Sequence, residues 1–306
     1  MEAFTFIPDS TGVEIELTND HLTLLRVEGF GALPPILETQ PQYLRGGDFV
    51  THARNPSRTM TVSIFSEADT LMEAYLRLDA LKAELRSLAF LDRSPAYGTL
   101  KRTRADGEIF EIGCFLSGGL EDPDANIVGN SLLFRTLNLQ FYAELPNFLG
   151  AENSVTVSNS GVGRDLAMPV RMPAIMGLGS DWSGSGESVN YAGNADGWNL
   201  EVEVDGPARD PVIYLGSYPD SVRVRPHIGF SGVLPSGEKL LVRMASPDYE
   251  LATLDSGINW SYRVSSGSPF PLPAGQSSDI IVAERSASSA QTPTYTVRWR
   301  DEYTGC

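Results

Sequence analysis

The sequence of 306 residues carries a formal net charge of −16, and acidic residues outnumber basic ones in both halves. A protein that grips nucleic acid needs Lys and Arg to replace the counterions along the phosphates, so this balance excludes a sequence-specific nucleic-acid binder. The N-terminus lacks the basic and apolar stretches of a signal peptide, and no segment reaches the roughly 20 apolar residues of a membrane span. We therefore expect no signal peptide and no membrane insertion.

Apolar residues make up 42% of the chain, which is enough to build cores, and the 29 glycines and 20 prolines favour a chain that turns often. At roughly 150 residues per domain, the length predicts two domains. The composition predicts a mainly β fold of sandwiches or barrels.

Short strands dominate the first 65 residues. Apolar residues alternate with polar ones over 13–17, and a second run over 22–27 follows the turn signal at Asn19-Asp20. Residues 36–56 are polar and irregular, and we expect a long loop there. Met60, Val62 and Ile64 then alternate with polar neighbours, which predicts a half-buried strand.

One amphipathic helix is predicted over 67–89, because its leucines and small residues recur at three- and four-residue steps. Ser66 followed by Asp69 matches the pattern of a capping box at the helix start. The apolar face consists of Leu71, Ala74, Tyr75, Leu78, Leu81, Leu85 and Leu88, and the polar face of Glu73, Arg77, Lys82, Glu84 and Arg86.

Strand signals return after the helix. Asp106-Gly107 predicts a tight primed turn between two strands, and the alternation over 133–141 predicts a long strand. From residue 156 onward helical periodicity disappears, and short strands alternate with turn residues, as in a β-sandwich. Examples are 200–204, 212–215, 222–224, 239–244, 280–282 and 295–299. We therefore predict an N-terminal β-barrel or sandwich domain with one helix at 1–150, and a C-terminal β-sandwich at 151–306.

The sequence offers no catalytic, cofactor or metal site. His21, His52 and His227 are isolated from one another and from any motif that binds metal. Cys114 lies in a strand pattern and is expected to be buried, whereas Cys306 is expected to belong to a loose tail. The chain is therefore predicted not to be an enzyme.

Four weaker patterns in the sequence do not meet the requirements of the sites that they resemble. Gly184-Ser185-Gly186 lacks the strand-to-helix elbow of a serine hydrolase, and the pairs of glycines at 161–163 and 177–179 precede no helix. The segment from Asp122 resembles the start of a calcium loop, but its sixth position is Ile127 and its twelfth is Leu133. Pairs of carboxylates are unavoidable among 39 acidic residues, so none indicates a glycosidase.

Two surface patterns leave alternatives open. Lys101-Arg102-Thr103-Arg104 fits either a solvated strand edge or a contact with an acidic neighbouring subunit. Among the aromatic residues of the second half, Trp299 alternates within a strand and is expected in the core. Trp182 and Trp198 flank a Gly/Ser-rich segment and are the better candidates for stacking on sugars.

The order of these features resembles the distal tail protein (Dit) family of siphophages. In the first half the resemblance rests on a polar loop around Arg45-Gly46-Gly47, a strand from Met60 to Phe65, and the leucine-rich helix that ends near Arg86-Ser87-Leu88. It also rests on the closing strand, which ends in Gln140-Phe141-Tyr142-Ala143-Glu144 and is followed by Pro146 and Phe148. In the second half it rests on Asn159-Ser160-Gly161, Pro169-Val170, Gly177, Leu272-Pro273-Ala274-Gly275, Ile280 to Val282, and Val297 to Arg300 before Tyr303. Gln276 departs from the family, where Asn usually follows that glycine.

The resemblance implies a structural virion protein without catalytic residues, cofactors or metals. The domain at 1–150 would form a homohexameric ring on the tail tube, and 151–306 would be a galectin-like sandwich. The ring would act as a DNA conduit and connect the tail tube protein to the tail hub and to peripheral receptor-binding proteins. The expected location is the baseplate or tail tip of a siphovirus, after assembly in the host cytoplasm.

Two other functions stay open at the level of sequence. The C-terminal sandwich could be a carbohydrate-binding module that contacts glycans of the host surface through exposed aromatic residues such as Trp182. A hydrolase with a carboxylate pair is the third hypothesis, and it would require turnover of cell-wall substrates.

Overall fold

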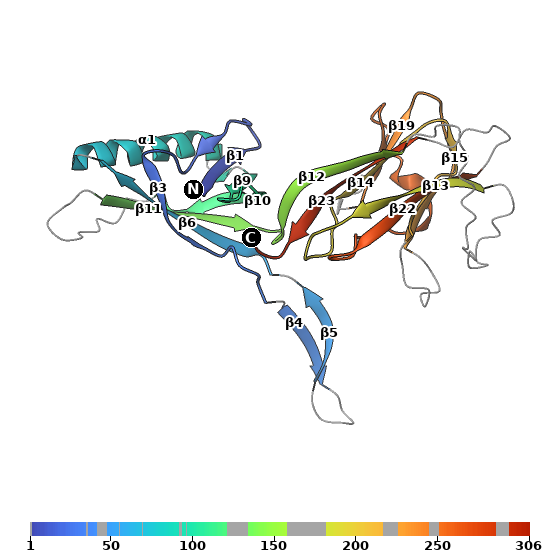
Figure 1. Cartoon of the computed structure of the whole chain (residues 1–306), viewed down its shortest axis with the longest axis horizontal. Coiled ribbons are helices and arrows are strands. Elements are labelled where there is room, and N and C mark those ends of the chain that lie inside the picture. The colour runs from blue at the N-terminus through green and yellow to red at the C-terminus, as the bar shows by residue number, and fades with distance from the viewer. Residues whose placement is uncertain are drawn as a thin grey trace. The chain divides into compact units, whose positions relative to one another are not determined.

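The computed structural model describes residues 2–34, 36–41, 48–54, 56–68, 70–91, 94–95, 97–120, 134–157, 182–216, 226–244, 251–285 and 294–306. The chain folds into two compact units, Met1–Gly150 with Tyr303–Cys306, and Ala151–Glu302. The last four residues, which sequence analysis placed in the second domain, thus belong to the first unit. The mainly β fold class is confirmed, since strands dominate both units and α1 is the only α-helix among the described residues (Figure 1).

The elements of the first unit are β1 (Ala3–Pro8), β2 (Ile15–Glu16), β3 (Leu22–Glu28), β4 (Ile36–Pro41), β5 (Asp48–Arg54), β6 (Arg58–Glu67), α1 (Leu71–Ala89), β7 (Phe90–Leu91), β8 (Ser94–Pro95), β9 (Tyr97–Thr103), β10 (Ile109–Gly118) and β11 (Phe134–Ala143). β12 (Phe148–Val157) starts in this unit and continues in the second.

The main sheet of the first unit is antiparallel and has the order β2-β1-β9-β10-β11-β6-β3. Its register places Phe6 opposite Leu100, and Leu100 opposite Ile112. All three side chains are buried. Residues alternate between buried and partly exposed along β10, as expected for a strand with one face on a core.

The helix α1 packs on this sheet over β6 and β11. Ala74, Leu78, Leu81 and Leu85 are buried, which confirms the predicted apolar face. The predicted capping box is wrong, because β6 continues through Ser66 and Glu67. Thr70 caps the helix instead, with its Oγ1 accepting a 3.2 Å hydrogen bond from the Glu73 amide. Lys82 is also buried, although its charge predicted the polar face.

The turn between β9 and β10 differs from the predicted primed turn. The Gly107 amide donates to the Arg104 carbonyl at 3.0 Å, and the Arg104 amide donates to Glu108 at 2.9 Å. Only Gly107 has a positive φ, of 90°, which is the geometry of a wider hairpin with a glycine bulge. The hairpin itself is where the sequence predicts it.

The segment predicted as a long polar loop contains a separate antiparallel hairpin. β4 and β5 form a two-stranded sheet of their own, with Ile36 opposite Arg54 and a register shift after Glu38. This hairpin extends away from the core of the first unit (Figure 1). The Arg45-Gly46-Gly47 motif lies outside the described residues. The described side chains of the hairpin, those of 36–38, are all exposed, so they lack the alternation of a half-buried strand.

The elements of the second unit are β13 (Trp182–Asn190), β14 (Leu200–Asp205), β15 (Ala208–Arg209), β16 (Val212–Leu215), β17 (His227–Phe230), β18 (Val233–Leu234), β19 (Lys239–Arg243), β20 (Ala252–Leu254), the 3-10 turn η1 (Ser261–Arg263), β21 (Val264–Gly267), β22 (Ser277–Arg285) and β23 (Tyr295–Tyr303).

Two antiparallel sheets make the second unit a β-sandwich. One has the order β23-β14-β19-β20, and the other β13-β22-β16-β17-β21. Both contribute to one core, for example Val202 and Val297 from the first sheet and Ile213 and Val282 from the second. The predicted strands at 200–204, 212–215, 239–244, 280–282 and 295–299 are present, whereas 222–224 lies outside the described residues.

Candidate functional site

The three histidines do not come together. His21 is exposed on a loop of the first unit, His52 lies in β5, and His227 lies in β17 with its ring 5.7 Å from that of Tyr214. Within the described ranges no group of three or more His, Cys, Asp or Glu residues could hold a metal ion. The Asp122 segment and the glycines at 161–163 and 177–179 lie outside those ranges.

Gly184-Ser185-Gly186 lies in the middle of β13, where its backbone pairs with β22. A nucleophile elbow needs a sharp turn between a strand and a helix, which this extended backbone does not provide. The described part of the chain also has no helix that is both long and apolar enough to cross a membrane.

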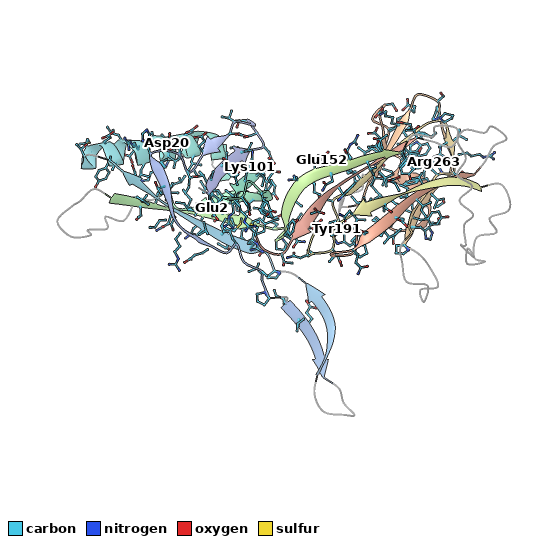
Figure 2. The ribbon with its side chains drawn as sticks, in the orientation of Figure 1. Glu2, Asp20, Lys101, Glu152, Tyr191 and Arg263 are labelled. Carbon is cyan, nitrogen blue, oxygen red and sulfur yellow. The ribbon has the colours of Figure 1, made fainter. Side chains whose placement is uncertain are left out.

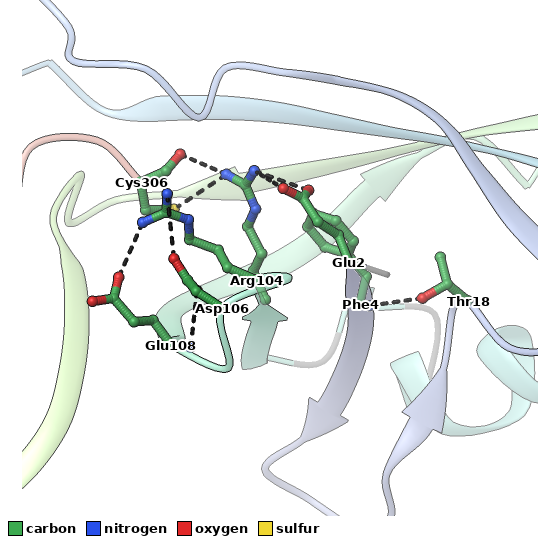
Figure 3. Close-up of polar contacts among 8 residues, drawn as sticks. Glu2, Phe4, Thr18, Arg104, Asp106, Glu108 and Cys306 are labelled. Carbon is green, nitrogen blue, oxygen red and sulfur yellow. Dashed lines mark hydrogen bonds and ion pairs between the residues drawn. The ribbon is translucent and has the colours of Figure 1, made fainter.

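The basic run at 101–104 is neither a strand edge nor an unpaired patch, because β9 lies between β1 and β10. Both terminal positions of Arg102 are used: one nitrogen binds both carboxylate oxygens of Glu2, at 3.0 and 2.9 Å, and the other contacts the Cys306 carbonyl at 2.5 Å. Arg104 pairs with Glu108 at 3.0 Å and with Asp106 at 3.6 Å (Figure 3). The partners of these two arginines come from the same chain.

Cys306 is packed rather than loose, which corrects the predicted tail. Its amide donates to the Phe30 carbonyl at 2.9 Å, and its carbonyl accepts from Arg102. Cys114 is buried as predicted.

Most aromatic side chains of the second unit belong to its core. Tyr191, Trp260 and Trp299 are buried, which confirms the prediction for Trp299. Trp198 is 43% exposed and stays a candidate for surface contacts. Trp182 starts β13, and its side chain lies outside the described part of the structure.

No sequence pattern indicates the buried arginine that follows the β4–β5 hairpin. Arg58 is 1% exposed, and its guanidinium donates to four backbone carbonyls, those of Gly29, Gly31, Pro146 and Thr304. Its Cζ also lies 4.7 Å from the centroid of the Phe148 ring. Burial lowers the pKa of Arg58 from its ordinary value, and the electrostatic influence of Cys306 partly offsets this effect. Arg58 thereby joins the end of the chain to the segment that leads into β4.

A second buried cluster orders the loop before β14. The Glu302 carboxylate is 4% exposed and accepts from the amides of Trp198 and Asn199, at 2.6 and 3.0 Å, and from the Asn199 side chain at 2.9 Å. The Tyr191 hydroxyl donates to the Ala195 carbonyl at 2.7 Å and accepts from the Glu302 amide at 2.9 Å. Tyr191 is labelled in Figure 2. Burial raises the pKa of Tyr191, so this hydroxyl keeps its proton.

An open cavity of about 340 Å³ lies beside this cluster, on the sheet of the second unit that contains β14, β19 and β23. Arginines, carboxylates and an asparagine line it, together with two residues of the strands below: Glu152, Asn199, Leu200, Glu201, Arg243, Arg298, Trp299 and Arg300. Charged side chains surround the cavity, but most of its lining surface is apolar, and its lining residues include no histidine, serine or cysteine.

Large apolar side chains are exposed at several places on the first unit, among them the β4–β5 hairpin and the helix α1. Ile36 and Leu37 of the β4–β5 hairpin are 40% and 53% exposed. On α1, Met72 and Leu76 are exposed one turn apart, on the face opposite the core. Large apolar side chains exposed on a projecting element are typical of surfaces that another chain covers.

Comparison with solved structures identifies the fold. Over 99% of both chains, this protein superposes on the Dit protein of phage SPP1 with a TM-score of 0.62 and 13% sequence identity. The chain has the fold of that Dit protein. The SPP1 structure is described as a paradigm of the hub adsorption apparatus in phages that infect Gram-positive bacteria.

Structures of the phage P2 baseplate in its activated conformation also match, with a TM-score of 0.46 and 9% identity over 97% of this chain and 98% of that one. No protein-family model matches the chain, and no curated protein matches it in sequence. The low sequence identity of 13% to the SPP1 Dit protein explains why the resemblance lies in the order of elements more than in shared residues.

Proposed function

We propose that this protein is a non-catalytic structural subunit of a phage tail tip, in which six copies form a ring. The observation that carries the proposal is the match to the SPP1 Dit fold over 99% of both chains, including both units.

In this proposal the first unit forms the ring on the tail tube, and the second unit faces the tail hub and receptor-binding proteins. The β4–β5 hairpin supports a contact between subunits. A two-stranded sheet is marginally stable in water by itself, and this one carries exposed Ile36 and Leu37. A neighbouring copy would cover these side chains, and head-to-tail contacts of this kind close into rings.

The net charge of −16 fits the conduit through which DNA would pass. A channel lined by an acidic protein repels the phosphates and does not hold them by counterion release. The same charge keeps the unassembled subunits soluble in the host cytoplasm, where we propose that assembly takes place.

The test is the native mass of the full-length protein, measured by native mass spectrometry over a range of concentrations and with negative-stain microscopy of the same sample. We expect a closed ring of six chains. A monomer that persists both alone and after addition of purified tail tube protein would contradict the proposal.

A further inference from the structure

The main sheet of the first unit has an outer face whose centre carries no charge. In β10, Cys114 and Leu116 point into the core and are buried, and the residues that alternate with them point to the other face of the sheet. The register of β10, β11 and β6 brings the corresponding residues of the three strands together on this face. We call it the uncharged face, and its central side chains, none of which is buried, are Thr59, Phe115, Ser117, Asn138, Gln140 and Tyr142.

Three aromatic side chains lie side by side at one end of the uncharged face. Phe115 is opposite Tyr97 of β9 and opposite Tyr142 of β11, and the centroids of the Phe115 and Tyr142 rings are 5.2 Å apart. Tyr97 is 43% exposed, and Gly113 leaves room for it, because a Cβ at position 113 would lie 2.7 Å from the tyrosine hydroxyl oxygen. Tyrosine and phenylalanine are enriched at the centre of protein–protein interfaces, where charged residues are depleted.

Charged residues border the uncharged face on two sides. On one side Lys101 of β9 lies opposite Glu111 of β10. On the other side Arg26 and Glu28 of the edge strand β3, next to β6, form an ion pair at 2.5 Å. An uncharged centre with a charged border is the usual arrangement of a surface that binds another protein.

The second unit shows how this protein builds a sheet face that stays in water. On the sheet of β14, β19 and β23, Glu203 pairs with Lys239 at 2.6 Å and with Arg298 at 3.0 Å. The described side chains at the centre of the uncharged face are neutral and form no such ladder of ion pairs. Contact with water alone therefore does not explain the composition of the uncharged face.

A ring with head-to-tail contacts needs two different surfaces on each copy. The β4–β5 hairpin, which extends away from the core of its own unit, supplies one of them (Figure 1). The outer face of α1, with exposed Met72 and Leu76, could be the second surface. However, the ion pair between Glu73 and Arg77, at 2.6 Å, lies in the same turns of the helix, and covering it would remove two charges from water. The uncharged face can be covered without this cost.

We propose that the uncharged face receives the β4–β5 hairpin of a neighbouring copy, with Ile36 and Leu37 packed against Tyr97, Phe115 and Tyr142. This inference rests on the proposed ring and names the surface that closes it. Each copy inserts its hairpin into the next copy and receives the hairpin of the previous one, so the same contact repeats around the ring.

The variant N138K/Q140K tests the uncharged face, because it places two charges at exposed positions in its centre. We expect the wild type to self-associate in native mass spectrometry and the variant to require at least about tenfold higher concentration, since lysines covered without a partner lose their hydration. The matched control is A80K/A83K, which adds the same charges at exposed positions of α1 and should associate as the wild type does. Unchanged melting temperatures would show that both variants are folded.

Crosslinking between copies tests the position of the hairpin. In a C306S background, unlabelled L37C protein is mixed with isotopically labelled Q140C protein and treated with a short bismaleimide. We expect mass spectrometry to find a crosslink between position 37 of the unlabelled chain and position 140 of the labelled one. The control replaces Q140C by M72C, which carries its cysteine on the outer face of α1 and should give no crosslink to position 37.

The outcomes separate this contact from the ring itself. A wild type that does not self-associate would overturn both. Assembly that persists in N138K/Q140K, equal loss of assembly in A80K/A83K, or crosslinking of position 37 to position 72 in place of position 140 would overturn the proposed contact and leave the ring standing.

Discussion

At the scale of single residues, Arg58 shows how one buried side chain can hold distant parts of the chain together. Its guanidinium donates to carbonyls from the segment after β3, from Pro146 before β12 and from Thr304 near the end of β23. These carbonyls would lose a buried donor if Arg58 were replaced by an apolar residue, and unsatisfied buried polar groups are costly.

We expect R58M to lower the free energy of unfolding by at least about 3 kcal/mol, since several buried carbonyls lose their partner at once. Chemical denaturation followed by circular dichroism measures this change. R26M is the matched control, because Arg26 is 72% exposed beside Glu28, and it should change stability by less than about 0.5 kcal/mol. Equal effects of the two variants would show that the carbonyl contacts of Arg58 stabilise the fold no more than an exposed arginine does.

Glu203 gives a prediction about pH. The hydrogen bond from Lys239, followed by that from Arg298, lowers the pKa of Glu203 below its ordinary value, despite partial burial. A carboxylate with a lowered folded-state pKa stabilises the protein above its unfolded value of about 4.3, and that contribution is lost as the pH falls through the folded-state pKa.

E203Q should therefore be less stable than the wild type at pH 7, and the difference should shrink toward pH 3. Melting temperatures measured from pH 3 to 7 would show this convergence. D20N removes an exposed carboxylate of the first unit and serves as the control. A difference that stays constant with pH would mean that the charge of Glu203 is not what stabilises the fold.

The thiol of Cys114 should not react with thiol reagents in the folded protein. Burial raises its pKa to about 12, so at pH 8 the thiolate is scarce as well as inaccessible. In a C306S background, we expect no labelling by a disulfide reagent at pH 8 until denaturant is added. Rapid labelling of the native protein would indicate that the strand pair β9–β10 opens.

At the scale of elements, the helices and strands that pack one face against a core were predicted from the sequence. The helix α1 and the strands β10, β11, β14 and β23 bury every second or every third to fourth side chain, and this periodicity is visible in the chain. The β4–β5 hairpin was missed, and Ile36, Leu37 and Glu38, the residues of the hairpin whose side chains are described, are exposed and so lack the alternation of a half-buried strand. The type of the turn between β9 and β10 was predicted wrongly, because a single glycine such as Gly107 is compatible with several turn types.

The candidate site was less accessible to sequence reasoning than the fold. Arg243, Arg298 and Glu201 are far apart in the chain, and only the strand register brings them together. Trp198 was identified as a surface candidate from its Gly-rich surroundings. Arg58 and Glu302 carry no local signal, because their partners are mostly backbone groups that every residue possesses.

The hairpin yields a prediction at this scale. L37D places a charge on an exposed apolar position that we propose a neighbouring copy covers, so it should disrupt the ring while the monomer stays folded. Native mass spectrometry would report the loss of hexamers. I258D is the matched control, because Ile258 is 52% exposed on the second unit, and its ring should persist. Intact rings in L37D would exclude the hairpin from the interface.

At the scale of the whole molecule, the two units differ in the elements from which they are built. The first combines a sheet, a helix and a projecting hairpin, and the second is a sandwich with a charged outer face. In the proposed function the first unit forms the ring, and the second unit faces the tail hub and receptor-binding proteins.

The return of Tyr303–Cys306 to the first unit means that the second unit is an insertion within it rather than an appendage at its end. Two covalent crossings connect the units, near Gly150 and near Tyr303. A protease that cuts one crossing would leave the second unit attached. Replacing 151–302 with a short linker would preserve both ends of the first unit, whereas truncation at residue 150 would remove the Thr304 and Cys306 contacts of Arg58 and Arg102.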